Sequence, residues 1–467
     1  MAYTVDYSSG TGVLGAADDI YYVVRDTTNY NEPKYRYLLK VTINSVVIGT
    51  FKQLPNNNDS ATFRIQEIVS SYVQQDESIL QLGKYDSSGS LMTTKIFSTN
   101  ASALETVTID FGYEKAATAN DAPTETWGAA AQTTFKAING SLLSQGSNSN
   151  ATNTASAFAL TNSSSAFLSA VSKVNGSFFN QDVIEGQFGA LAFLNGDDVG
   201  SDDCSYFHVT YKTSNNVTLE TGYFTNDTAQ GGKAPAASLT DSQSLLYFGC
   251  FPANLESQAI DSDLKPSNVS SAWAYYEVQA ASSTTLSGNE ASAVYRFTKK
   301  CDTRYNDVNS VITKFPGEYF LCWWNELGGI DNLLCDAASK ASQKIDRSRF
   351  RTKGGNAFNA GDTTPYSRTS QEGGLTSAGN ETTTSITLNT RENNPEELNN
   401  LIMSLANSPR VYVYSSDVQQ PNSLGKYPAF RRCVVTDMQM TYNTAVNDKI
   451  SNYAITIEIS RRKPNVR

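Results

Sequence analysis

Residues 35–51 read YRYLLKVTINSVVIGTF, and this stretch decides the fold class. Apolar side chains recur at every second position of its first half, at Tyr37, Leu39, Val41 and Ile43. Period two places these side chains on one face of a strand. The polar pair Asn44-Ser45 then interrupts the run, which is typical of a turn between two strands. The stretch therefore predicts a β-hairpin with one buried face.

Short apolar runs of the same kind recur along the chain, separated by clusters of Asn, Ser, Gly and Asp. They lie at Ile20–Val24, Thr62–Gln66, Glu105–Gly112, Phe188–Leu194, Tyr206–Tyr211, Val217–Phe224, Ser244–Phe251, Ala272–Gln279, Ala293–Thr298 and Glu318–Asn325. Closely spaced strands with this punctuation indicate antiparallel sandwiches or barrels.

The C-terminal part adds one amphipathic helix at about residues 395–407. Asn394 can cap it, Pro395 occupies the first helical position, and Glu397 completes a capping box. Its apolar residues, Leu398, Leu401, Ile402 and Leu405, share one face. A hairpin of 430–442 with 453–461 follows, with Tyr453, Ile455, Ile457 and Ile459 facing inward.

These patterns predict a mainly β, multi-domain chain. We expect an N-terminal β domain at 1–115, a central β domain at 116–345 and a C-terminal β domain with the helix at 346–467. Residues 116–181 are rich in Ser, Asn and Ala with few large apolar anchors, so they predict a flexible or irregularly folded insertion in the central domain.

Composition excludes several classes of protein. The formal net charge of −10 argues against a nucleic-acid binder as a whole, since phosphate neutralisation needs a basic face. The sequence has no apolar stretch long enough for a membrane-spanning helix and no pattern of a secretion signal. Six scattered cysteines without a Cys-x-x-Cys pair predict free thiols in a reducing cytoplasm.

Histidine is nearly absent, which disfavours enzyme chemistry. His208 is the only one, and it lies within a strand pattern where a structural role is expected. No phosphate-binding glycine loop opens a helix, and no cofactor is predicted. One loop clusters four carboxylates, at Asp197, Asp198, Asp202 and Asp203. We interpret them as solvated, with a calcium or magnesium site as the weaker alternative and catalysis as the weakest.

Two groups of side chains are candidates for interfaces. If residues 344–353 are extended, then Arg347, Arg349, Arg351 and Lys353 form a basic line on one face. Water or an acidic neighbour is the favoured partner of this line, and DNA is the alternative. Four aromatic residues are candidates for either an interface or the core, namely Trp323, Trp324, Trp273 and Tyr275.

The order of features resembles a family of virion structural proteins, associated with the tail, in tailed bacteriophages that infect Bacteroidetes-type bacteria. The resemblance is carried by Tyr35–Ile43, Phe51–Asn56 and Phe63–Ile65, by Tyr247–Gly249, Pro252–Leu255 and Trp273–Tyr276, by Cys301 with Arg304-Tyr305, by the aromatic strand and turn at Phe320–Asp331, and by Ile386–Thr390, the capped helix, Ser408–Tyr414 and the final strand. It implies a component of a phage tail or its appendages and assigns no catalytic residue.

We therefore expect a non-enzymatic virion protein, made in the host cytoplasm, that acts by assembling into a homo-oligomeric ring or trimer and by contacting other virion proteins. One alternative is a fibre or spike that binds host glycans through its aromatic rings, and this would show sequence repeats, which are absent. A capsid-associated protein and a histidine-independent glycan depolymerase are weaker alternatives.

Overall fold

The fold is mainly β, as the strand patterns predict. The computed structural model describes residues 3–10, 12–74, 97–99, 104–142, 160, 162–174, 176–185, 187–194, 204–225, 245–258, 260–270, 272–300, 319–335, 337, 339–352, 374–390, 395–414, 431–442 and 451–459. Within these residues the strands form several sheets, and nearly all neighbouring strands are antiparallel. Three α-helices and one short 3-10 helix accompany them.

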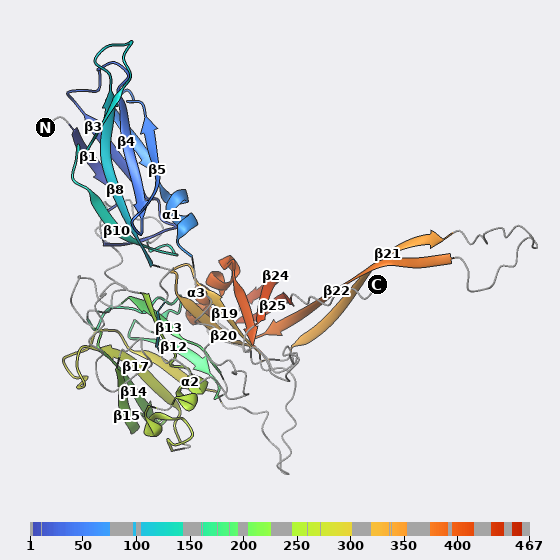
Figure 1. Ribbon diagram of the computed structural model, residues 1–467. Coiled ribbons are helices and arrows are strands. Elements are labelled where there is room, and N and C mark those ends of the chain that lie inside the picture. The colour runs from blue at the N-terminus through green and yellow to red at the C-terminus, as the bar shows by residue number, and fades with distance from the viewer. Residues whose placement is uncertain are drawn as a thin grey trace, which may run out of the picture.

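The N-terminal unit consists of two sheets around one core (Figure 1). A three-stranded sheet has the order β1-β3-β6, and a larger sheet has the order β2-β10-β8-β4-β5, with β9 beside β8. The bounds are β1 (Tyr3–Ser8), β2 (Gly12–Gly15), β3 (Tyr21–Asp26), β4 (Arg36–Ile43), β5 (Val46–Gln53), β6 (Ser60–Arg64), α1 (Gln66–Tyr72), β8 (Leu104–Lys115), β9 (Thr124–Trp127) and β10 (Thr133–Ile138).

The stretch that predicts a hairpin forms one. β4 pairs with β5, and the turn residues Asn44 and Ser45 have φ angles of 47° and 65°. Two successive positive φ values match the twist of the flanking strands, which is why Asn is favoured there. Tyr37, Leu39 and Val41 are fully buried, as the alternation predicts.

The central unit packs a six-stranded sheet against a three-stranded one. The larger sheet has the order β11-β12-β18-β17-β14-β15, and the smaller has the order β13-β16-β7. Phe207 lies between them, with its ring 4.8 Å from Phe193 and 4.5 Å from Phe248. The bounds are β7 (Phe97–Thr99), β11 (Lys173–Val174), β12 (Phe178–Val183), β13 (Leu191–Leu194), β14 (Tyr206–Lys212), β15 (Thr218–Thr225), β16 (Leu245–Phe248), α2 (Pro252–Ser257), η3 (Ser262–Leu264), β17 (Tyr275–Ala281) and β18 (Tyr295–Lys299).

The C-terminal unit is a seven-stranded antiparallel sheet with the order β20-β19-β23-β24-β25-β22-β21. The helix α3 contributes its apolar face to the same buried cluster as this sheet, and it occupies the predicted residues 395–407. The bounds are β19 (Tyr319–Trp324), β20 (Ile330–Cys335), β21 (Lys340–Thr352), β22 (Gly374–Asn389), α3 (Pro395–Asn407), β23 (Val411–Tyr414), β24 (Arg431–Tyr442) and β25 (Ser451–Ile459).

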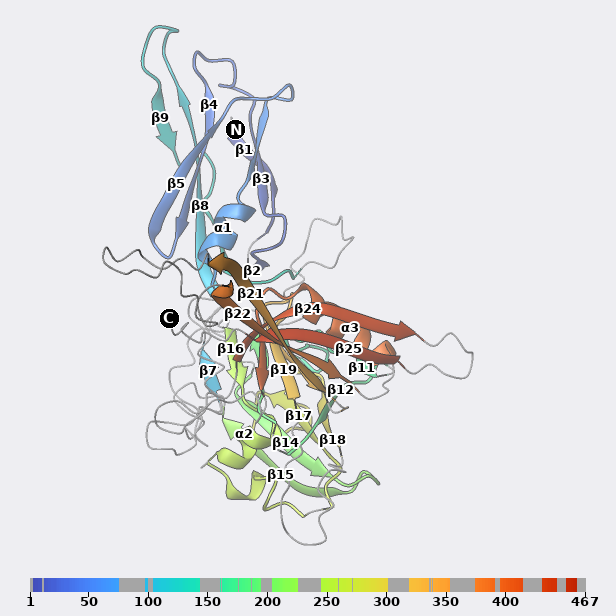
Figure 2. The ribbon, with the colours of Figure 1, turned by 90° about the vertical axis from the view of Figure 1, so that its right-hand side faces the viewer.

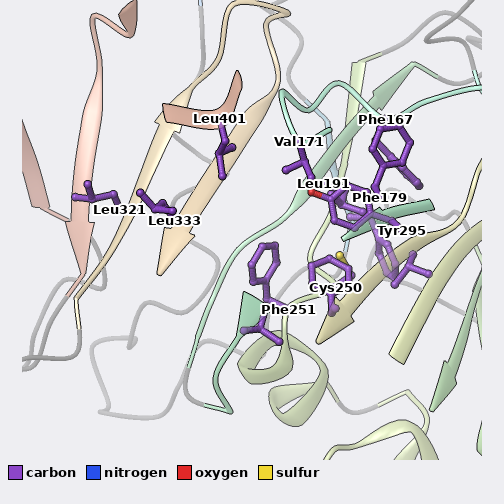
Figure 3. Close-up of a cluster of buried hydrophobic side chains, with 14 of the residues drawn as sticks. Phe167, Val171, Phe179, Leu191, Cys250, Phe251, Tyr295, Leu321, Leu333 and Leu401 are labelled. Carbon is purple, nitrogen blue, oxygen red and sulfur yellow. The ribbon is translucent and has the colours of Figure 1, made fainter. Parts of the chain in front are cut away.

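The central and C-terminal units share one continuous hydrophobic core. Leu321, Leu333 and Leu401 come from the C-terminal sheet and α3, and they belong to the same buried cluster as Phe179 and Tyr295 of the central sheet (Figure 3). A second cluster joins all three units, because it contains Ile138, Leu194 and Trp324 among others. The units are therefore held together by apolar burial, the dominant favourable term in folding.

Sheet membership does not follow the predicted domain boundaries. The N-terminal sheet continues through β10, well past residue 115, and the C-terminal sheet takes in β19 and β20 before residue 346. The expected irregular insertion at 116–181 contains β9, β10, β11 and most of β12 in its described parts. Phe135, Phe167 and Phe179 are buried there, so a few well-spaced rings anchor a stretch whose average composition is polar.

Candidate assembly interface

The most conspicuous surface feature is a β-hairpin that leaves the body of the protein. β21 pairs with β22 from Lys340↔Thr387 to Thr352↔Gly374, whereas β25 pairs with β22 only from Thr384 onward. Residues 344–352 and 374–383, called the arm below, therefore form a two-stranded ribbon beyond the sheet, reaching away from the rest of the chain (Figure 1). At about 3.3 Å per residue, its nine-residue strand spans roughly 30 Å.

The described residues offer the arm little stabilisation. Every residue from 340 to 351 is exposed, and the apolar side chains of Ile345, Phe350 and Leu375 are 49%, 48% and 61% exposed. β21 is the last strand of its sheet, so its outer edge has no neighbouring strand among the described residues. An isolated two-stranded ribbon is at best marginally stable in water. A protruding ribbon with open edges is therefore suited to a partner that supplies the missing contacts.

One face of the arm carries the predicted basic line. Arg347, Arg349 and Arg351 alternate along the extended strand β21, and Ile345 continues the same face. Lys353 lies outside the described residues. The three arginines stand opposite Asn380, Ser377 and Leu375 in the register, so no acidic residue faces them across the ribbon. Within the described part of the chain, none of them forms an ion pair.

The opposite face of β21 has a different character. Lys344 forms an exposed ion pair with Asp346, with 2.9 Å between Nζ and Oδ2. Asp346 itself stands opposite Glu381 in the register, and Ser348 stands opposite Gly379. The two faces thus differ in charge: one holds three basic residues flanked by apolar ones, and the other holds both acidic residues of the paired strands.

The root of the arm is firmly attached to the core. Ile386 and Leu388 of β22 are buried, and they stand opposite Ile457 and Ile455 of β25. Three threonines and a serine at residues 382–385 link this buried part to the exposed part. The sequence did not mark residues 374–383 as a strand, because they lack apolar alternation; β-branched threonines and pairing to β21 supply the preference instead.

The aromatic candidates belong to the core. Trp323 and Trp324 are 0% and 1% exposed, so of the two alternatives, interface or core, they belong to the core. Nε1 of Trp323 donates a hydrogen bond of 3.2 Å to Oγ of Ser404 on α3. Trp324 packs edge-on against Tyr247. Because six consecutive residues of β19 are buried, both faces of that strand are covered by protein.

Trp273 and Tyr275 lie in the central unit and are also largely buried. Lys299 covers the ring of Trp273 at 4.3 Å, and Arg296 stacks on Tyr275 at 4.3 Å from the ring centre. Arg296 also lies over Phe178 at 3.9 Å. These rings are engaged by cations of the same chain, which leaves them poorly placed to stack on a sugar.

The motif Asn325-x-Leu-Gly-Gly-x-Asp331 builds a buried joint between units. The Asn325 side chain accepts hydrogen bonds from the backbone amides of Leu327 and Gly329 and donates one of 2.8 Å to the Leu168 carbonyl. Asp331 accepts hydrogen bonds from Ser169 Oγ at 2.6 Å and from the backbone amide of residue 170 at 2.9 Å. The turn of the C-terminal sheet is thereby fixed to the central unit.

Glycines allow three backbones to meet at this joint. A Cβ atom on Gly329 would overlap the Leu168 carbonyl, and one on Gly140 would overlap the backbone of Leu327 and Gly328. Gly328 also has a φ of 81°, which L side chains rarely adopt. The backbone amide of residue 141 donates to the Glu326 carbonyl at 2.6 Å, so the N-terminal unit joins the same point. Sequence reasoning did not identify this role, because the contacts are far apart in the chain.

Asp331 is a buried carboxyl group at the joint. Burial raises its pKa from 3.8 to about 6, although hydrogen bonds from Ser169, Ala170 and Asn325 favour the charged form. Asn325 donates its bond through Nδ2 at 2.9 Å. All of these partners hold the carboxylate in place, so the group serves the joint and has no access to a substrate.

The remaining sequence-based candidates are a histidine, a loop of aspartates and the cysteines. His208 is buried in β14, with Nε2 3.1 Å from the Ser283 carbonyl, and burial lowers its pKa. The four aspartates between residues 197 and 203 lie outside the described residues. Within the part of the chain that the structure describes, no three His, Cys, Asp or Glu residues gather as metal ligands. Five cysteines are buried, at Cys204, Cys250, Cys322, Cys335 and Cys433, and Cys301 lies outside the described residues.

No helix among the described residues is both long and apolar enough to cross a membrane. No protein-family model matches the sequence, and no curated protein does. A solved structure of E. coli alpha-2-macroglobulin in its native conformation has a TM-score of 0.19 with this chain at 9% identity. The match covers 83% of this chain and 22% of the macroglobulin, and a similarity this low carries no argument about fold or function.

Proposed function

We propose that this chain is a structural component of a tailed bacteriophage particle, a tail or tail-appendage protein that acts by homo-oligomeric assembly and not by catalysis. The observation that carries the proposal is the arm. A ribbon of about 30 Å with exposed apolar side chains and open edges has no stabilising partner within the described chain. A second protein surface would supply one.

The anchoring of the arm supports a role in assembly. Its root is part of a seven-stranded sheet that shares a core with the central unit. Force or binding at the arm is therefore transmitted to a rigid body and not to a loose linker. The resemblance of several sequence stretches to tail-associated virion proteins gives the phage part of the proposal.

The proposal is tested by the mass of the purified full chain in solution and by mass spectrometry of purified phage particles. We expect a defined ring or trimer in solution and peptides of this chain in the particles at a constant copy number. A chain that stays monomeric at all concentrations and is absent from particles would refute the proposal.

A further inference from the structure

The charge of the chain is divided unevenly along its length. Residues 1–318 contain 32 acidic and 19 basic residues, whereas residues 319–467 contain 14 acidic and 17 basic residues. β21 alone contributes five basic side chains against one acidic one. The basic arm therefore belongs to a chain whose first 318 residues carry a formal net charge of −13.

We propose that the arginine face of the arm, formed by Ile345, Arg347, Arg349 and Arg351 with Leu375 of β22, docks on an acidic surface within residues 1–318 of a second copy of this chain. The inference rests on the proposed function, because it names the partner of the same arm. Charge complementarity between the two parts of the chain selects a second copy as the occupant.

The composition of this face suits a protein partner. Successive arginines on one side of a strand are about 7 Å apart, and their mutual repulsion in water is only about 0.6 kcal/mol per pair. The arginine face is therefore stable when exposed to water, and it still attracts carboxylates, for which the guanidinium group is the best-matched donor. Ile345 and Leu375 are about half exposed on the same face, and they gain more from apolar contact than from a phosphate backbone.

The arm points away from the body of its own chain. Its strands extend from a buried root at Ile386 and Leu388, and they reach to the right in Figure 1 and toward the viewer in Figure 2. A neighbouring copy can therefore meet the arm without any bend of the ribbon.

Two charge-matched double variants of the full chain test the inference. Arg347→Gln with Arg349→Gln removes two charges from the arginine face, and Lys340→Gln with Lys344→Gln removes two from the opposite face of the same strand. All four residues are exposed, so both variants should keep the thermal midpoint of the wild type. Self-association is measured by sedimentation velocity at 50 and 500 mM NaCl.

We expect the arginine variant to associate about tenfold or more weakly than the wild type at 50 mM NaCl, and the lysine variant to change little. High salt should reduce the difference, because screening weakens exposed charge pairs. Equal association of both variants would overturn the inference while leaving the proposed function intact. The inference would also be overturned if the arginine variant associated like the wild type but, unlike the wild type, failed to bind random duplex DNA. A wild-type chain that never associates would contradict the proposed function itself.

Discussion

Replacing Gly329 with alanine should weaken the joint between the three units more than any conservative change at an exposed glycine. The new methyl group would overlap the Leu168 carbonyl. That carbonyl accepts the 2.8 Å hydrogen bond from Asn325, and the same Asn325 accepts one of 2.8 Å from the amide of Gly329. Relief of the overlap must therefore move at least one of two backbones away from its hydrogen-bond partner.

The expected cost follows from these contacts. Overpacking in a filled core costs about 1–3 kcal/mol, and each weakened buried hydrogen bond costs about 1 kcal/mol or more. The lower chain entropy of alanine in the unfolded state returns about 0.4–1 kcal/mol. We therefore expect Gly329→Ala to lower the free energy of unfolding by about 2–4 kcal/mol.

Urea denaturation followed by tryptophan fluorescence measures this change, since Trp323 and Trp324 lie on the strand before the joint. The matched control is Gly49→Ala on the edge strand β5, where an added Cβ would meet only the ring of Phe51 at 3.4 Å. We expect the control to change stability by less than about 0.5 kcal/mol. If Gly329→Ala behaves like the control, the three-way joint does not stabilise the protein as argued.

Three further predictions concern buried polar groups. The raised pKa of Asp331 means that the native state binds a proton more tightly than the unfolded state. The protonation of Asp331 therefore contributes about 3 kcal/mol to the free energy of unfolding below pH 3.8, and this contribution is lost as the pH rises through about 6. Asp331→Asn should remove this part of the pH dependence of unfolding. Trp323→Phe should cost about 1–2 kcal/mol more than Trp324→Phe in urea titrations, because Trp323 donates to Ser404 whereas Nε1 of Trp324 has no partner among the described residues. A thiol reagent at pH 8 should label at most one of the six cysteines before unfolding and all six afterwards, since five are buried and burial raises the pKa of Cys433 to about 12.

Local patterns in the sequence identify most of the individual strands. The alternation in Tyr453–Ile459 predicts the buried face of β25, and the capping pattern at Pro395 predicts α3. Both depend on contacts within a few residues or on one hydrophobic face. For the same reason the alternation at Arg347, Arg349 and Arg351 predicts an extended basic line correctly.

The alternation of side chains does not predict that the arm projects from the sheet as a separate ribbon. Its existence depends on β25 ending its pairing at Thr384 while β21 continues to Thr352. Alternation says nothing about how many neighbours a strand has. The sequence does not predict the joint at Asn325 and Asp331 for a related reason. Its hydrogen-bond partners, Leu168 and Ser169, are more than 150 residues away in the chain. Sequence reasoning identifies faces of strands, and tertiary pairing decides which of them are covered.

Deleting the arm tests the central claim most directly. Gln343 and Thr384 are register partners, so residues 344–383 can be replaced by an Asn-Gly turn that closes the shortened hairpin. Among the described side chains of the arm none belongs to the buried clusters, so the thermal midpoint should stay within about 2 °C of the full chain. The deciding measurement is the mass of the shortened chain by sedimentation velocity. We predict a folded monomer where the full chain assembles, and an assembly of the same copy number without the arm would contradict the account.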